Sequence, residues 1–89
     1  MSYTLAAGHR AQANHDGAFV WADSTNTDFV STANDQFLIR ANGGIGINTN
    51  QPRATIEIAK SSYGSLGGTL RLSNLAGGTN AQVAVDFAT

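Results

Sequence analysis

The chain has 89 residues, no cysteine, a net charge of −1 and a charged fraction of 12%. A chain of this size forms at most one domain, close to the limit at which a single hydrophobic core suffices. Its five basic residues are scattered, so it lacks the positive patch of a nucleic-acid-binding protein. No apolar run approaches the roughly 20 residues that a membrane-spanning helix needs, so no membrane insertion is expected.

The hydrophobic content of 42% includes many alanines, whose burial contributes little free energy. Small chains with a limited core are usually stabilised by disulfides, by a metal or by other subunits. Disulfides are excluded here, and the sequence contains no cluster of metal ligands. We therefore expect the chain to be stable as an oligomer, without a metal or cofactor.

Two short apolar runs predict β-strands. Residues 18–22 read AFVWA and residues 36–40 read QFLIR, and each run is bounded by Asn, Asp, Ser or Gly. No stretch carries the 3.6-residue apolar period of a helix. Because the apolar residues are continuous rather than alternating, we expect burial on both faces of each strand, one against the chain's own coil and one against a neighbour.

A weak repeat links the first of these strands to the N-terminal region. Residues 5–8 and 19–22 lie fourteen positions apart, and each is followed by a polar loop. Short repeats of this length are typical of stacked coils, in which each coil buries its apolar face against its neighbours. We therefore predict a tightly wound β-coil over residues 1–50.

Beyond Pro52 the pattern changes to alternation of apolar and polar residues in segments 55–60, 69–73 and 82–87. Alternation predicts strands with one exposed face, and the glycines between them predict tight turns. We expect short antiparallel strands over residues 51–89. In the earlier turn at residues 42–44, Gly43 is expected to adopt a positive φ, so that Gly43→Val would disrupt folding.

Residues 2–13 follow the pattern S-x-x-x-A-A-G-x-x-A-x-A, which is similar to the head repeats of trimeric autotransporter adhesins. Residues 44–52, GIGINTNQP, resemble the G-[IV]-G-I-x-T-x-x-P junction of tail-fibre proteins, and a GGTLRLSN-like strand follows. The resemblance extends from Ser2 to about Asn74. The chaperone domain that often ends such fibres is not matched by the end of the sequence at Thr89.

The resemblance implies an all-β, intertwined homotrimeric rod of the β-helix or β-prism type, in a phage tail fibre, a phage-like particle or a bacterial surface protein. Its role would be structural and adhesive, in attachment to a host surface, with a cell-surface glycan as receptor. The residues themselves lead us to expect no enzymatic activity, because the acids are spaced singly. A cyclic trimer closes through contacts between unlike patches, which two-faced apolar strands can supply. The residues expected in the trimer core are Phe19, Trp21, Phe37, Ile39, Ile45 and Ile47.

Two alternative functions remain open, a carbohydrate-binding adhesin head and a fragment of a polysaccharide depolymerase. Tyr63 lies in a Ser- and Gly-rich loop and could stack on a sugar ring, whereas Trp21 lies within an apolar run that favours core packing. A depolymerase would require acids such as Glu57 and Asp86, whose replacement would abolish turnover. The spacing of the acids predicts no catalytic pair.

The polar residues of the first half suggest three further sites, and for each we favour a structural role. His9, His15 and Asp16 lack the spacing of a four-ligand metal site. The segments 23–28 and 34–35 offer oxygen ligands for calcium but lack the EF-hand pattern, and Asx turns explain them more simply. Ser24 or Ser31 could be combined with His15 and Asp28 as a triad, a combination that many sequences allow.

Overall fold

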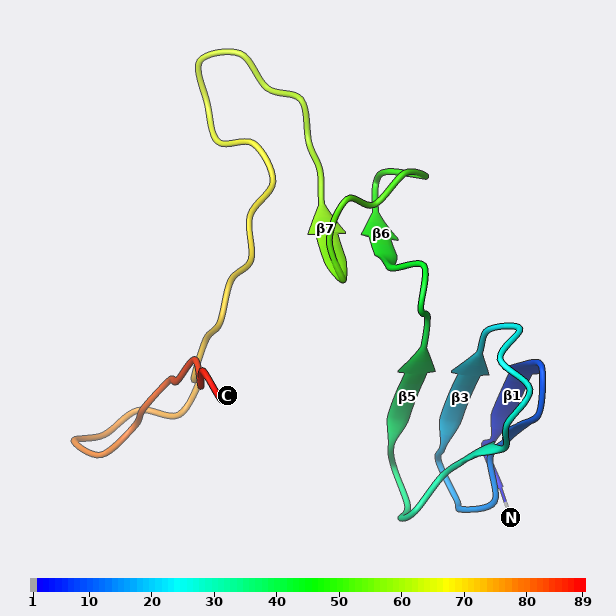
Figure 1. Ribbon diagram of the computed structural model, residues 1–89. Helices are drawn as coiled ribbons and strands as arrows, with labels where there is room; N and C mark the ends of the chain where they lie inside the picture. The colour runs from blue at the N-terminus through cyan, green and yellow to red at the C-terminus, as the bar shows by residue number, and fades with distance from the viewer. Residues whose placement is uncertain (1) are drawn as a thin grey trace.

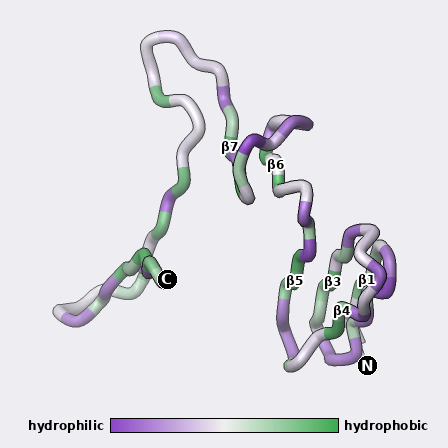
Figure 2. Tube along the Cα trace, in the orientation of Figure 1, coloured by the Kyte–Doolittle hydropathy of each residue, from purple (hydrophilic) through white to green (hydrophobic). Residues whose placement is uncertain are grey.

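The computed structural model describes residues 2–89, which form an all-β chain without a helix (Figure 1). Apolar residues lie on the strands and also along the strand-free C-terminal part, and the turns between the strands are mostly hydrophilic (Figure 2). The strands are β1 (Leu5–Gly8), β2 (Ala11–Gln12), β3 (Phe19–Ala22), β4 (Phe29–Val30), β5 (Phe37–Arg40), β6 (Ile45–Ile47) and β7 (Ile56–Ile58).

The N-terminal half winds as a stack of parallel coils, which resembles a β-solenoid. Strands β1, β3 and β5 lie side by side in one sheet, with Leu5 opposite Phe19 and Phe19 opposite Phe37 (Figure 1). The short strands β2 and β4 pair in parallel in a second sheet. The fourteen-residue repeat is therefore confirmed, and so are the strands predicted at 18–22 and 36–40, to within one residue at their N-terminal ends.

Small side chains fill the inside of the coils. Within residues 2–89, the buried apolar residues are Ala18, Val20 and Ala22, and Ser31 is a buried polar residue. Alternation along β3 places Val20 and Ala22 inside, which leaves Phe19 and Trp21 on the outer face. For this strand, the sequence predicts one face buried against the chain's own coil and the other against a neighbour. The burial against the chain's own coil is confirmed.

Left-handed backbone conformations recur where the chain enters each coil. Tyr3, Gly17 and Asp35 have φ values of 62°, 73° and 62°, and each lies two residues before a strand of the large sheet. Backbone hydrogen bonds connect these turns, from Gly17 N to Ser2 O and from Asp35 N to Asp16 O. The repeat therefore extends to the turns, although the residue types differ from one turn to the next.

The segment after β5 corrects two expectations. Strands β6 and β7 pair in parallel, so the strand predicted at residues 55–60 is parallel, not antiparallel, to its neighbour. The connection between the two strands passes through residue 51. In the preceding turn the positive φ of 104° belongs to Gly44, whereas no positive φ is found at Gly43. A Cβ at Gly43 would meet nothing within 4 Å, so the reason given for its sensitivity is wrong.

Residues 59–89 contain no strand, so the antiparallel strands predicted at 69–73 and 82–87 do not form within the chain. This part extends away from the coils and turns back on itself near its end (Figure 1). The radius of gyration is 16.8 Å, whereas a compact domain of this length would have about 12 Å. The chain taken alone is therefore not compact.

Candidate interaction surface

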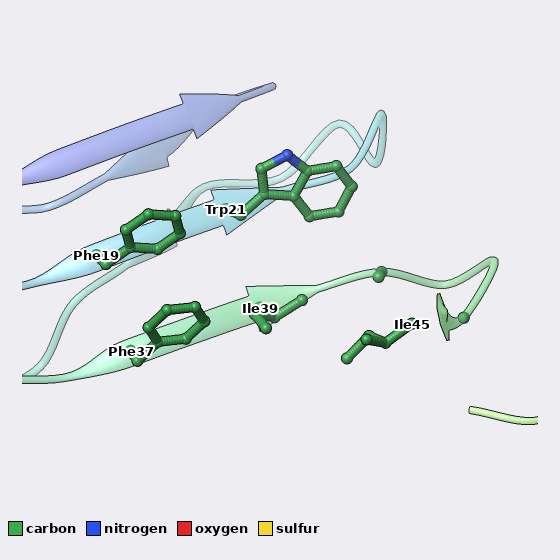
Figure 3. A pocket seen from close by; sticks show the side chains of 7 residues that line it. Phe19, Trp21, Phe37, Ile39 and Ile45 are labelled. Atoms are coloured by element: carbon green, nitrogen blue, oxygen red, sulfur yellow. The ribbon is translucent and has the colours of Figure 1, made fainter. Parts of the chain in front are cut away.

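The outer face of the large sheet and the adjoining start of β6 carry a row of apolar side chains, which we call the outer ladder. It consists of Phe19 and Trp21 from β3, Phe37 and Ile39 from β5, and Ile45 at the start of β6 (Figure 3). The parallel register places Phe19 beside Phe37 and Trp21 beside Ile39, so the ladder follows from the coil repeat.

These side chains line a shallow groove of about 260 Å³. The rings of Phe19 and Phe37 are stacked, with centroids 4.5 Å apart and an interplanar angle of 4° (Figure 3). Much of the ladder remains in contact with solvent, because Phe37 is 67% exposed, Ile39 40% and Trp21 39%. An apolar surface of this kind is typical of a protein interface.

Five of the six residues predicted for a trimer core line this groove together, and the sixth, Ile47, is exposed outside it. The groove also includes Ala41 and Gly44, which sequence reasoning did not identify. Both lie in the turn between β5 and β6, and their small size gives no signal in a search for apolar runs. The role of the six residues in a trimer stays a prediction.

An ion pair stabilises the end of the stack next to the ladder. Arg40 Nε lies 3.0 Å from Asp23 Oδ1, and both side chains are less than one-fifth exposed. The Arg40 guanidinium also donates to the carbonyl oxygens of His9, Thr25 and Thr27. Arg40 thus connects β5 to loops of both earlier coils, and its ion pair with Asp23 is made within the chain.

Asp23 accepts hydrogen bonds from the backbone N–H groups of Asn42 and Thr25 as well as from Arg40. The backbone bond from Asn42, followed by the contacts with Thr25, holds the pKa of the Asp23 carboxyl well below its usual range. The Asx-turn interpretation of this segment is confirmed by the bond between Thr25 N and Asp23 Oδ1, at 3.1 Å.

The histidines have neutral hydrogen-bond partners. His9 Nε2 lies 3.1 Å from Asn26 Oδ1, and His15 Nδ1 lies 2.7 Å from Ser31 Oγ. Throughout residues 2–89, no group of three or more His, Cys, Asp or Glu side chains is arranged to hold a metal ion.

The structure brings together two members of the hypothetical triad, Ser31 and His15, but not the third. Asp28 pairs with Arg10 at 2.8 Å. Ser31 is 3% exposed, and its hydroxyl accepts a hydrogen bond from Asn14 N, so the contacts of Ser31 with residues 14 and 15 connect two coils. Such burial suits a structural hydrogen bond rather than a nucleophile that must reach a substrate.

The acids considered for a depolymerase have different surroundings. Glu57 forms an ion pair with Arg53 at 3.0 Å, and the hydrogen bonds from Arg53 lower the pKa of the Glu57 carboxyl. Asp86 lies within residues 59–89, the part of the chain that contains no strand. Of the two residues considered for sugar stacking, Tyr63 is fully exposed on a loop and Trp21 belongs to the outer ladder.

Comparisons of the chain with models of protein families, with curated protein sequences and with solved structures found no match. Within residues 2–89, a search for a helix long and apolar enough to span a membrane found none. The described residues therefore define a class of architecture, an all-β chain with solenoid-like stacking of parallel strands.

Proposed function

We propose that this chain is a structural segment of a homotrimeric fibre, in which the outer ladders of three copies pack around a common axis. The observation that carries this proposal is the uncovered row of aromatic and aliphatic side chains on a rigidly registered parallel stack. Stacked coils give a rod its stiffness, and the ladder gives each rod a surface for its neighbours.

The energetics favour covering the ladder. Phe37 exposes 67% of its surface, which corresponds to roughly 130 Å² if a phenyl side chain offers about 200 Å². At about 25 cal/mol per Å², burying this ring alone would contribute about 3 kcal/mol per chain. Three chains around an axis would bury three such rings, together with Trp21 and Ile39 of each copy.

The fibre would have an adhesive role in attachment to a host surface, as part of a phage tail fibre, a phage-like particle or a bacterial surface protein. This part of the proposal is supported by the sequence resemblance of residues 2–13 and 44–52. In the fibre, the coils would supply the shaft, and exposed loops such as the one around Tyr63 would be available to a glycan.

The proposal is tested by measuring the mass of the protein in solution, by light scattering coupled to size exclusion over a dilution series. We expect a trimer of three 9.2 kDa chains. Phe37→Asp places a charge in the ladder and is expected to give monomers. Ser24→Asp, at an exposed loop position outside the groove, is the matched control and should remain trimeric.

A wild-type monomer at all concentrations would overturn the proposal. A Phe37→Asp variant that assembles as well as the control would show that the ladder is not the interface. A glycan array with the trimer then tests the adhesive role, with Tyr63→Ala as the variant that should lose binding if that loop contacts the sugar.

A further inference from the structure

The C-terminal part contains a second unpartnered surface, separate from the outer ladder. Segments 69–73 and 82–87 read TLRLS and QVAVDF, with apolar and polar residues in strict alternation except for Ala84. The apolar members are exposed, among them Leu70 at 71%, Val85 at 62% and Phe87 at 89%. Such a pattern predicts two strands with one buried face, yet neither strand forms within the chain.

No backbone ladder joins the two segments within residues 2–89. A side-chain hydrogen bond from Asn74 Nδ2, just after the first segment, to Gln82 O, at 2.9 Å, connects the chain on either side of the turn between them. Extended backbone with free N–H and C=O groups readily pairs with another chain. The segments therefore have the backbone and the side-chain pattern of strands that lack their partner strands.

The exposed area indicates what covers them. The chain has 7197 Å² of accessible surface, whereas a folded monomer of its mass would have about 4,900 Å². The excess of about 2,300 Å² exceeds the roughly 800 Å² per partner of a standard interface and would serve two neighbours. A subunit of a cyclic trimer has two neighbours, so a further copy of this chain accounts for the excess.

The charges suggest which strands pair. Arg71 lies on the polar face of the first segment and Asp86 on the polar face of the second, and neither forms an ion pair within residues 2–89. Pairing the first segment of one copy with the second segment of the next brings both charges to the same outer face. The apolar residues of both segments then point together toward the axis.

We propose that segment 69–73 of each copy pairs with segment 82–87 of the neighbouring copy, forming an intersubunit β-layer in which Leu70, Leu72, Val83, Val85 and Phe87 of three chains build an apolar core. The layer rests on the proposed homotrimer and adds to it a second interface, which orders residues 69–87 upon assembly.

The absence of cysteine makes a crosslinking test direct, because one introduced cysteine can form a disulfide only between chains. In Val85→Cys, threefold symmetry brings three thiols near the axis, and oxidation should place up to about two thirds of the chains in linked dimers. Ala84→Cys carries the thiol on the opposite face of the same strand and should give few dimers. Circular dichroism checks that both variants fold alike.

Light scattering on the same samples separates the two proposals. A trimer in which Val85→Cys crosslinks no better than Ala84→Cys would overturn the intersubunit layer and leave the coil trimer standing. A monomer without crosslinks would overturn both. Trypsin gives an independent readout, since we expect cleavage after Arg71 to be at least tenfold slower in the trimer than in diluted chains; equal rates would contradict the layer.

Discussion

Trp21→Ala tests the outer ladder at its largest side chain. Trp21 is 39% exposed, which corresponds to roughly 100 Å² of an indole side chain of about 250 Å². At about 25 cal/mol per Å², covering that area in the proposed trimer would contribute about 2.5 kcal/mol per chain, or about 7 kcal/mol for three chains. Trp21→Ala also removes the part of the indole that is already covered within the coil. Its total cost in free energy should therefore reach the roughly 3 to 5 kcal/mol per chain expected for a core Trp.

The assay is the concentration at which half of the chains are assembled, measured by light scattering over a dilution series. Since each 1.4 kcal/mol is a factor of ten in the association constant, and a trimer midpoint varies with its square root, Trp21→Ala should raise the midpoint by about two to three orders of magnitude. An unchanged midpoint would refute the placement of Trp21 in an interface.

Val20→Ala tests the inner face of β3, opposite to Trp21. Val20 points into the coil and is fully buried, so Val20→Ala should lower the free energy of unfolding by about 2 kcal/mol through loss of buried methyl groups. Its effect should be visible in thermal melts of chains diluted below the assembly midpoint, whereas its effect on the midpoint itself should be much smaller than that of Trp21→Ala. Equal shifts of the assembly midpoint in both variants would contradict the assignment of inner and outer faces.

Gly8 has φ of 98°, and a Cβ there would lie 1.7 Å from Ala22 O, so Gly8→Ala should lower the free energy of unfolding by more than about 2 kcal/mol. Gly43→Ala, with open space at the Cβ, is the control and should melt close to the wild type. Because the folded pKa of Asp23 is depressed, its contribution is present above the unfolded pKa of about 4 and is lost as the pH falls further. Acid titration followed by circular dichroism should show this loss, and Asp23→Asn should remove that part of the pH dependence. Arg40→Lys cannot reproduce the contacts to three carbonyl oxygens and the ion pair, so its melting temperature should fall, whereas unchanged melting would contradict the role of Arg40 at the end of the stack.

The strands of the stack could be predicted because their signal is local. Apolar runs bounded by Asp, Asn and Gly predict the strands at residues 18–22 and 36–40. The fourteen-residue spacing predicts that residues 5–8 lie beside residues 19–22. The second register could not be read from spacing, because the loop of residues 23–28 lengthens the next coil to eighteen residues, from Phe19 to Phe37. A repeat whose period changes is invisible to a search at one fixed spacing.

The pairing of β7 could not be predicted from its own residues. Alternation in residues 55–60 indicates one exposed face but carries no information on strand direction, which depends on the connection. Here Ile45 and its partner Ile56 lie eleven positions apart, and the backbone conformation at Gly44 lets the chain begin another coil. The sequence does not distinguish Gly43 from Gly44 as the residue with positive φ, because two adjacent glycines have the same conformational freedom.

The polar contacts that hold the coils in register are made by residues other than those of the outer ladder. The inner positions are filled by small residues, and register is held at the coil ends by polar bonds such as those of Ser31 with His15 and of Arg40 with Asp23. None of these groups belongs to the outer ladder. A charge placed on the ladder should therefore abolish assembly while leaving the coil register intact. Circular dichroism of a monomeric ladder variant checks this independence, because the stack should keep the β signal of the wild type.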